Sequence, residues 1–177
     1  MINIDLAYVK NRLLCMIMFK KFCVSIATLF GIGNSPIVPG TLGAFFGTLF
    51  YAAIFNRVSS LEMVCITLFM LLLAIVICDI AEQEIGEKDP SKVILDEFVV
   101  MPIVFFGTKI FFIEKICYCW VLLAGFLIFR LFDIVKPFGI KSTQSLSGGV
   151  GIVVDDIVAA IYSNIVLTLI GIFLTVL

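Results

Sequence analysis

Long apolar runs separated by short polar segments dominate this chain, and that pattern predicts a helical membrane protein. A helix needs about 20 mostly apolar residues to cross a bilayer, with about 17 as the lower limit. The chain contains five apolar segments: 41–55, 61–78, 98–113, 116–132 and 157–177. We therefore expect an all-α, polytopic membrane protein with about four to five apolar helices in a single domain, residues 1–177.

These segments differ in how well they suit a membrane. Segment 61–78 is the clearest span, 116–132 and 157–177 are long enough, and 41–55 is slightly short. Segment 98–113 is short, and a proline, a glycine and a lysine interrupt it. Such interruptions are typical of a broken, re-entrant or buried helix, so its crossing stays open.

The distribution of basic residues predicts which loops face the cytoplasm. If all five segments cross, residues 1–40, 79–97 and 133–156 share one side. Counting Arg130 at the end of a span, that side holds nine of the twelve Lys and Arg residues, so the positive-inside rule makes it cytoplasmic. It also holds eleven of the thirteen acids. Acids contribute little to topology, so their clustering needs another cause.

Residues 1–30 are apolar but carry scattered positive charges. Lys10, Arg12, Lys20 and Lys21 interrupt the run, and no small-residue cleavage site follows it. This is not the pattern of a clean signal peptide. It favours a basic amphipathic helix that lies on the membrane surface.

Composition supports the membrane interpretation and excludes several kinds of chemistry. The chain is 62% hydrophobic, against about 45–50% in soluble domains. A net charge of -1 gives no indication of nucleic-acid binding. The absence of histidine excludes histidine nucleophiles, histidine bases and histidine metal sites. The six cysteines form no CxxC motif, so we expect buried, apolar thiols rather than disulfides or zinc ligands.

The first candidate for chemistry is a charged group at the end of segment 116–132. On a helix, Arg130, Asp133 and Lys136 fall within an arc of about 120°. One hypothesis is a membrane anchor with an Arg–Asp pair at i,i+3. The other is an anion clamp, in which the two cations hold a phosphate and the acid holds a metal ion.

The second candidate is a pair of acids at the start of the last apolar segment. An N-cap role would explain one of Asp155 and Asp156, but not both. Adjacent like charges near a membrane are costly, and a divalent cation would neutralise them. The preceding glycines permit a tight turn or a close approach of the backbone to an anion: Gly148, Gly149 and Gly151.

A second acid pair, Asp96 and Glu97, precedes segment 98–113. The acids just upstream suit a solvated helix face, with Asp79 and Glu82 as the expected exceptions because they adjoin a span. A turn that opens a helix is predicted at Pro36, Pro39 and Gly40. Thr41 would be its N-cap, and the free N–H groups there would attract a phosphate. A plain helix start explains that turn equally well.

Taken together, these residues predict a magnesium-dependent phosphate site at the bilayer surface. No thiol or aspartyl nucleophile motif is present, so a metal-activated water is the expected attacking group. Arg130, Lys136 and Thr41 are the expected phosphate contacts. The expected metal ligands are Glu97, Asp133, Asp155 and Asp156. The expected catalytic residues are these four and Asp96.

Four stretches together resemble the phosphatidylglycerophosphatase A family: "SPIVPGTLG", "LDEFV", "FRLFDIVKP" and "GGVGIVVDD". They stand in the order typical of that family. Val100, Gly139 and Ala160 depart from its pattern without changing a charge. The resemblance implies a bacterial inner-membrane enzyme facing the cytoplasm. It implies that Mg²⁺ is required to remove the terminal phosphate of phosphatidylglycerophosphate, giving phosphatidylglycerol. The expected partners are the phospholipid and the membrane, with neither nucleic acid nor an obligate protein partner.

Three alternatives compete with this interpretation. A small transporter or ion-coupled subunit could use clustered acids as ion sites, although here the acids lie in loops and not at mid-span. A CDP-alcohol phosphotransferase would carry a DGxxAR signature, which is missing. A purely structural membrane subunit leaves the acid pairs unexplained.

Overall fold

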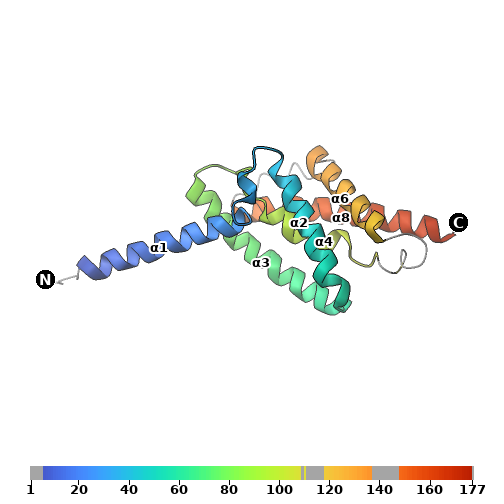
Figure 1. The fold of residues 1–177 in the computed structure, drawn as a ribbon, viewed down its shortest axis with the longest axis horizontal. Helices are drawn as coiled ribbons and strands as arrows, with labels where there is room; N and C mark the ends of the chain where they lie inside the picture. The colour runs from blue at the N-terminus through green and yellow to red at the C-terminus, as the bar shows by residue number, and fades with distance from the viewer. Residues whose placement is uncertain (1–5, 109, 111–117, 137–147, 177) are drawn as a thin grey trace.

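The computed structural model describes residues 6–108, 110, 118–136 and 148–176, and within them the regular elements are helices. Two short 3-10 turns, η1 (Ile32–Asn34) and η2 (Phe55–Arg57), flank the second helix. The α-helices, with the labels of Figure 1, are α1 (Leu6–Ala27), α2 (Pro39–Ile54), α3 (Ser60–Ile85), α4 (Leu95–Val104), α6 (Tyr118–Val135) and α8 (Gly149–Val176). The predicted all-α fold is confirmed for this part of the chain.

In the described part of the chain, three helices are long and apolar enough to cross a membrane: Ser60–Ile85, Tyr118–Val135 and Gly149–Thr175. The sixteen residues of α2 extend about 24 Å, less than the roughly 30 Å of a hydrocarbon core. The three long helices alone fall short of the predicted four to five apolar helices. Counting the shorter α2 gives four, and counting α4 as well gives five. The number of crossings and the side on which each loop lies stay predictions.

Helix α4 contains the first part of the interrupted segment 98–113. It has ten residues and a proline, Pro102, in its interior. At 1.5 Å per residue it is about 15 Å long, too short to cross a bilayer. Seven of its residues are buried among the other helices. Helix α4 is therefore not a membrane span, so the arrangement with five crossings is not supported. Residues 109 and 111–113 of this segment lie outside the described part.

The N-terminal prediction is only half right. Residues 6–27 form one helix, α1, which projects from the other helices along most of its length (Figure 1). Its apolar side chains do not gather on one face, because four consecutive residues, Met16 to Phe19, are all exposed. Since successive residues are 100° apart, they surround the helix. The expected amphipathic face is therefore wrong.

Close helix packing holds α4 between α2 and α8. On α2, Gly43 and Gly47 lie so near α4 that an added Cβ would approach the Ile94 and Phe98 carbonyl oxygens to 2.7 and 2.6 Å. Such small residues let two backbones approach each other. At the other end of α4, the Asn164 amide of α8 donates to the carbonyls of Val104 and Phe106, at 3.0 and 2.8 Å. The depth and direction of α4 are therefore fixed from both sides.

The cysteines are only partly as predicted. The five described cysteines are free thiols, and Cys23 and Cys78 are buried. Three others are exposed on helix surfaces, against the expectation of burial: Cys15, Cys65 and Cys119. The weak polarity of a thiol allows such exposure on an apolar helix. Cys117 lies outside the described residues.

Candidate active site

The charged residues singled out in the sequence meet in one pocket of about 300 Å³ at one end of the bundle. The N-terminal ends of α2 and α4, the C-terminal end of α6 and the second turn of α8 surround it. Its lining includes Pro39, Gly40, Asp96, Glu97, Arg130, Asp133, Lys136, Asp155 and Asp156. Segments far apart in the chain thus bring both acid pairs and both cations together.

Three of these acids, Asp96, Glu97 and Asp156, form a tight group, which we name the acid triad. One carboxylate oxygen from each lies within 4.8 Å of the other two. Asp96 and Asp156 are only 7% and 3% exposed. Within the described residues, a buried oxygen of each acid lacks a hydrogen-bond partner: Asp96 Oδ1, Glu97 Oε2 and Asp156 Oδ2. Buried, unpartnered carboxylate oxygens this close together could hold a metal ion.

The electrostatics of the two acids on α4 support that conclusion. Burial, followed by the neighbouring Glu97, raises the pKa of Asp96 well above its ordinary value. Burial and then the charge of Asp156 raise the pKa of Glu97 to about 8, although Arg130 acts in the opposite direction. Without a cation, burial therefore favours protons on Asp96 and Glu97. A divalent cation would replace them, since carboxylate oxygens are the preferred ligands of Mg²⁺ and Ca²⁺.

The other two acids, Asp133 and Asp155, differ because each contacts a cation; we name them the paired acids. Arg130 Nη1 donates to Asp133 Oδ2 at 2.6 Å, one turn along α6. The same nitrogen lies 3.8 Å from Glu97 Oε1 in the triad. Lys136 Nζ lies 2.5 Å from Asp155 Oδ2. The predicted i,i+3 pair of Arg130 and Asp133 on α6 is confirmed. Both cations also line the pocket, so the pairing does not prevent them from binding an anion there.

Backbone geometry at the end of α6 directs Lys136 toward α8. Lys136 is the first residue after the helix and has a left-handed φ of 45°. Its N–H donates to the Phe132 carbonyl at 2.8 Å, which closes the last turn. Burial lowers the pKa of Lys136, but the contact with Asp155 outweighs it and the net change is upward. The ammonium group therefore stays charged beside the pocket.

The turn before α2 is partly as predicted. Pro39 is the first residue of the helix, and Gly40 is packed so tightly that a Cβ there would lie 2.1 Å from Glu97 Oε1. The prediction for Thr41 as N-cap is wrong, because Val38 occupies that position and Thr41 is the third helical residue. Thr41 is also absent from the pocket lining, and Pro36 is exposed outside it.

The N-cap explanation for Asp155 or Asp156 is also wrong, because α8 begins at Gly149 and both acids lie in its second turn. Gly148, at φ 73°, and Gly149 bring this helix against α3: a Cβ on Gly149 would lie 2.0 Å from the Ile75 carbonyl oxygen. The close approach is thus to α3, where the anion beside the two glycines is the Asp79 carboxylate. Gly151 lines the neighbouring pocket described next.

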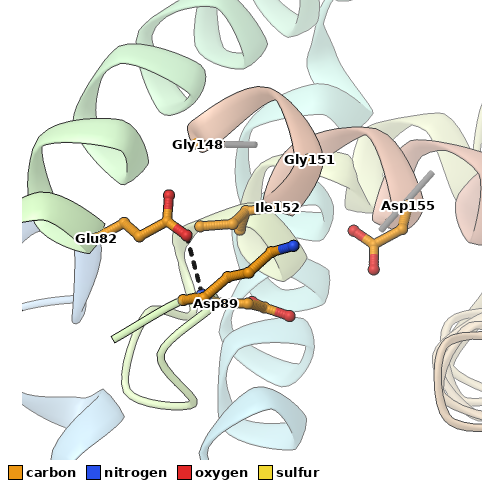
Figure 2. Close-up of a pocket in the computed structure, with 7 residues that line it drawn as sticks. Glu82, Asp89, Gly148, Gly151, Ile152 and Asp155 are labelled. Carbon is orange, nitrogen blue, oxygen red and sulfur yellow. Dashed lines mark hydrogen bonds between the residues drawn. The ribbon is translucent and has the colours of Figure 1, made fainter. Parts of the chain in front are cut away.

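Sequence reasoning missed one wall of the site. A second pocket of about 320 Å³ adjoins the first, and Asp89 and Asp155 line both (Figure 2). The Asp89 N–H donates to Glu82 Oε1 at 3.2 Å, and Asp89 has a left-handed φ of 48°. Asp89 is exposed, as expected for the acids upstream of Asp96, yet it also lines the pocket. The Asp-Pro dipeptide at Asp89 and Pro90, a turn signal shortly before an acid pair, could have indicated its place.

Asp79 meets the expectation that it differs from the solvated acids. Its Oδ1 accepts the Gly149 N–H at 3.2 Å, and its Oδ2 accepts from Gln83 at 2.8 Å. The first bond satisfies a free N–H at the start of α8, the helix that carries Asp155 and Asp156. Asp79 therefore ties the end of α3 to the helix that carries two of the five acids.

Comparison with known proteins identifies the family. The family model described as "Phosphatidylglycerophosphatase A" matches residues 25–171. A Haemophilus influenzae "Phosphatidylglycerophosphatase A" is 34% identical over 142 residues, 80% of this chain and 83% of the relative. The Escherichia coli protein of that name is 33% identical over 147 residues, 82% of this chain and 81% of the relative.

A third relative carries a different name. A Bacteroides thetaiotaomicron protein named "Putative phosphatidylinositol-3-phosphatase" is 34% identical over 148 residues, 81% of this chain and 90% of the relative. No solved structure matches the chain. Because the family model spans most of the chain and relatives of similar length carry the family name, the chain belongs to the phosphatidylglycerophosphatase A family.

Proposed function

We propose that this protein is a magnesium-dependent phosphatidylglycerophosphatase that hydrolyses the terminal phosphate monoester in the pocket between α2, α4, α6 and α8. The family and two of its named members support the phosphatase activity. The observation that carries the finer proposal is the acid triad, three buried carboxylates with unpartnered oxygens beside Arg130 and Lys136.

The triad residues would hold the cation. Their chemistry fits, because hard divalent cations prefer carboxylate oxygens and the triad has an excess of buried negative charge. A bound Mg²⁺ would supply charge neutralisation at the phosphoryl oxygens and an activated water. Of the four ligands expected from sequence, Glu97 and Asp156 are in this group, and Asp96 joins them. Asp133 and Asp155 instead contact the cations, so we assign them to positioning.

Arg130 and Lys136 would bind the phosphate. Their charges lie at the pocket wall next to the triad, where they would offset the negative charge of the phosphoryl oxygens and of the leaving oxygen. The contact with Asp133 orients the guanidinium group, and the contact with Asp155 orients the ammonium group. Gly40 leaves space beside Glu97 and Arg130 that any side chain would fill. These residues together favour a phosphate monoester over a neutral group.

The lipid would reach this pocket from the bilayer. Two of the three helices suited to crossing a membrane line the site, α6 with its C-terminal end and α8 with its second turn. Among the described residues, Lys88, Lys92, Arg130 and Lys136 lie at or beside the pocket end, against Arg57 at the far end of α2, and this excess favours a cytoplasmic face. We therefore propose an inner-membrane enzyme with its active site at the cytoplasmic surface.

The direct test measures phosphate release from phosphatidylglycerophosphate by the purified protein in detergent micelles. We expect release that EDTA abolishes and Mg²⁺ restores, and no release by the Asp156→Asn variant. Phosphatidylinositol-3-phosphate is the second substrate to assay, because one relative carries that name. Release unaffected by EDTA would contradict the metal site, and turnover of the inositol lipid alone would contradict the proposed substrate.

The transporter alternative gains no support. The acids that could serve as ion sites gather in one pocket at a single end of the bundle. An ion pathway needs polar groups along the depth of the membrane. Family membership also points to a phosphatase.

A further inference from the structure

One side of the active-site pocket ends in exposed apolar side chains. In the loop before α2, Ile37 and Val38 are 75% and 54% exposed, and Val38 lines the pocket. On α6, Ile134 lies one turn after Arg130 and is 68% exposed. We name Ile37, Val38 and Ile134 the apolar edge. Ile37 and Val38 lie in a turn, where polar residues are usual, so their exposure needs an explanation.

The two parts of the apolar edge come from segments that meet at the pocket. Arg130 Nη1 of α6 lies 3.2 Å from the position that a Cβ on Gly40 would take. Further along the two helices, the rings of Phe45 and Phe126 meet edge to face, with centroids 6.3 Å apart. The start of α2 therefore lies beside the end of α6. Of the apolar edge, Val38 lines the pocket itself, Ile37 precedes it in the chain, and Ile134 follows the lining residue Arg130 by one helical turn.

The backbone at Val38 indicates that its side chain has a use. Val38 has φ 42° and ψ 64°, in the left-handed region. A β-branched residue there is an outlier, and a residue before proline normally has an extended backbone. Asparagine or glycine would adopt this conformation more easily. Local backbone preference thus does not explain a valine here, whereas an apolar contact at the pocket would.

Another part of the pocket wall is polar. There the second pocket begins, with the carboxylates of Glu82, Asp89 and Asp155 around it (Figure 2), and Lys88 also lines it. A wall of charged groups suits water and polar groups, and it disfavours hydrocarbon. The lining therefore has a part suited to solvent and, at Val38, a part suited to lipid.

We propose that the apolar edge binds the diacylglycerol end of the substrate while the terminal phosphate lies at the acid triad. This inference rests on the proposed function, which supplies the position of the phosphate. The edge selects phosphate monoesters carried on a diacylglycerol lipid over the same head group free in solution. The selection arises because removing apolar side chains and hydrocarbon from water stabilises the lipid complex alone.

The test compares a lipid with its soluble head group in matched variants. Val38→Asn and Ile37→Asn make the apolar edge polar, and Asn suits the left-handed backbone at position 38. Phe30→Asn is the control, because Phe30 also has a left-handed φ, 56°, and is 78% exposed but lines another pocket. The two substrates are phosphatidylglycerophosphate in mixed micelles and its deacylated, water-soluble form.

For the lipid, we expect Val38→Asn to raise KM about tenfold and Ile37→Asn about threefold, with kcat within about twofold, because only binding of the apolar part is lost. For the soluble form, the KM stays within about twofold of the wild-type value. Where turnover of the soluble form is slow, its inhibition constant against lipid hydrolysis gives the same comparison. Phe30→Asn leaves both substrates unchanged.

Three results would overturn the inference. They are an unchanged lipid KM in Val38→Asn, an equal loss for lipid and soluble form, and a loss in Phe30→Asn as large as in Val38→Asn. Failure of the proposed function is separate and is seen first, since wild-type protein with Mg²⁺ would then release no phosphate from the lipid.

Discussion

The acid triad and the paired acids line the same pocket but have opposite surroundings. Asp96, Glu97 and Asp156 are buried with carboxylate oxygens that lack partners within the described residues. Asp133 and Asp155 each contact a cation, at 2.6 and 2.5 Å. The difference teaches that charge alone does not assign a role. The triad has unpartnered carboxylate oxygens that could hold a cation, whereas the paired acids already contact Arg130 and Lys136.

The largest effect is expected in the triad. Glu97→Gln and Asp156→Asn should each lower kcat by about 1,000-fold or more, because each would remove a metal ligand that no neighbour replaces. Phosphate release from phosphatidylglycerophosphate measures this loss. Glu87→Gln, an exposed acid in the loop before α4, should keep normal rates. If both triad variants keep near-normal rates, the distinction between the two groups of acids is wrong.

Arg130→Lys should give the next largest effect. Arg130 contacts a paired acid and also lies 3.8 Å from the triad. A lysine keeps the charge but cannot form the planar, two-pronged contact with a phosphate. We expect kcat/KM to fall by about 100-fold, comparable to loss of one transition-state donor. Arg57→Lys, at an exposed arginine, is the matched control. Normal saturation kinetics for Arg130→Lys would reduce Arg130 to a membrane anchor.

A smaller effect is expected at the pair formed by Lys136 and Asp155. Lys136→Gln and Asp155→Asn should each lower kcat/KM by about tenfold, because each leaves its former partner uncompensated, Asp155 in a buried position and Lys136 in a partly exposed one. The double variant should lose much less than the product of the two single losses, since both changes remove the same contact. Independent, multiplicative losses would indicate that Asp155 acts on the substrate or the metal directly.

The smallest effect concerns stability and pH. Without metal, folded Glu97 keeps its proton up to a pKa of about 8, whereas the unfolded carboxyl group releases it near pH 4. The folded state then binds more protons between these values, so the free energy of unfolding falls as pH rises. We expect the Tm without metal to drop by about 5 °C from pH 6 to pH 8.5.

Added Mg²⁺ should oppose that drop. It would bind the deprotonated triad and so raise the Tm more at pH 8.5 than at pH 6. Glu97→Gln should flatten the pH dependence, because it removes the titrating group. Thermal unfolding in detergent measures the Tm of the metal-free protein, of the protein with Mg²⁺ and of the Glu97→Gln variant at both pH values. A Tm that rises with pH in metal-free protein would contradict the burial of uncompensated acids in the triad.

Part of the site could be predicted from the sequence because it depends on residue type. Charged side chains next to membrane-spanning segments raise the free energy of the protein unless they are neutralised. Their positions in this apolar chain therefore indicated a site for a phosphate and a cation. The i,i+3 spacing of Arg130 and Asp133 also follows from helix geometry alone. The sequence could not separate the triad from the paired acids, because that depends on which helices meet. Thr41 was misassigned because two cap positions are plausible beside Pro39, and only the backbone at Val38 distinguishes them.

By itself, the sequence determined that the chain is helical, apolar and acidic at the ends of its helices, because these properties depend on composition and on spacing within one segment. Only the tertiary structure decided that the ten-residue α4 lies buried between α2 and α8 and carries Asp96 and Glu97 to Asp156. The physical reason is that burial and charge neutralisation depend on distances between helices. Those distances follow from glycine contacts between α2 and α4, and from the two bonds of Asn164, and no single segment encodes them.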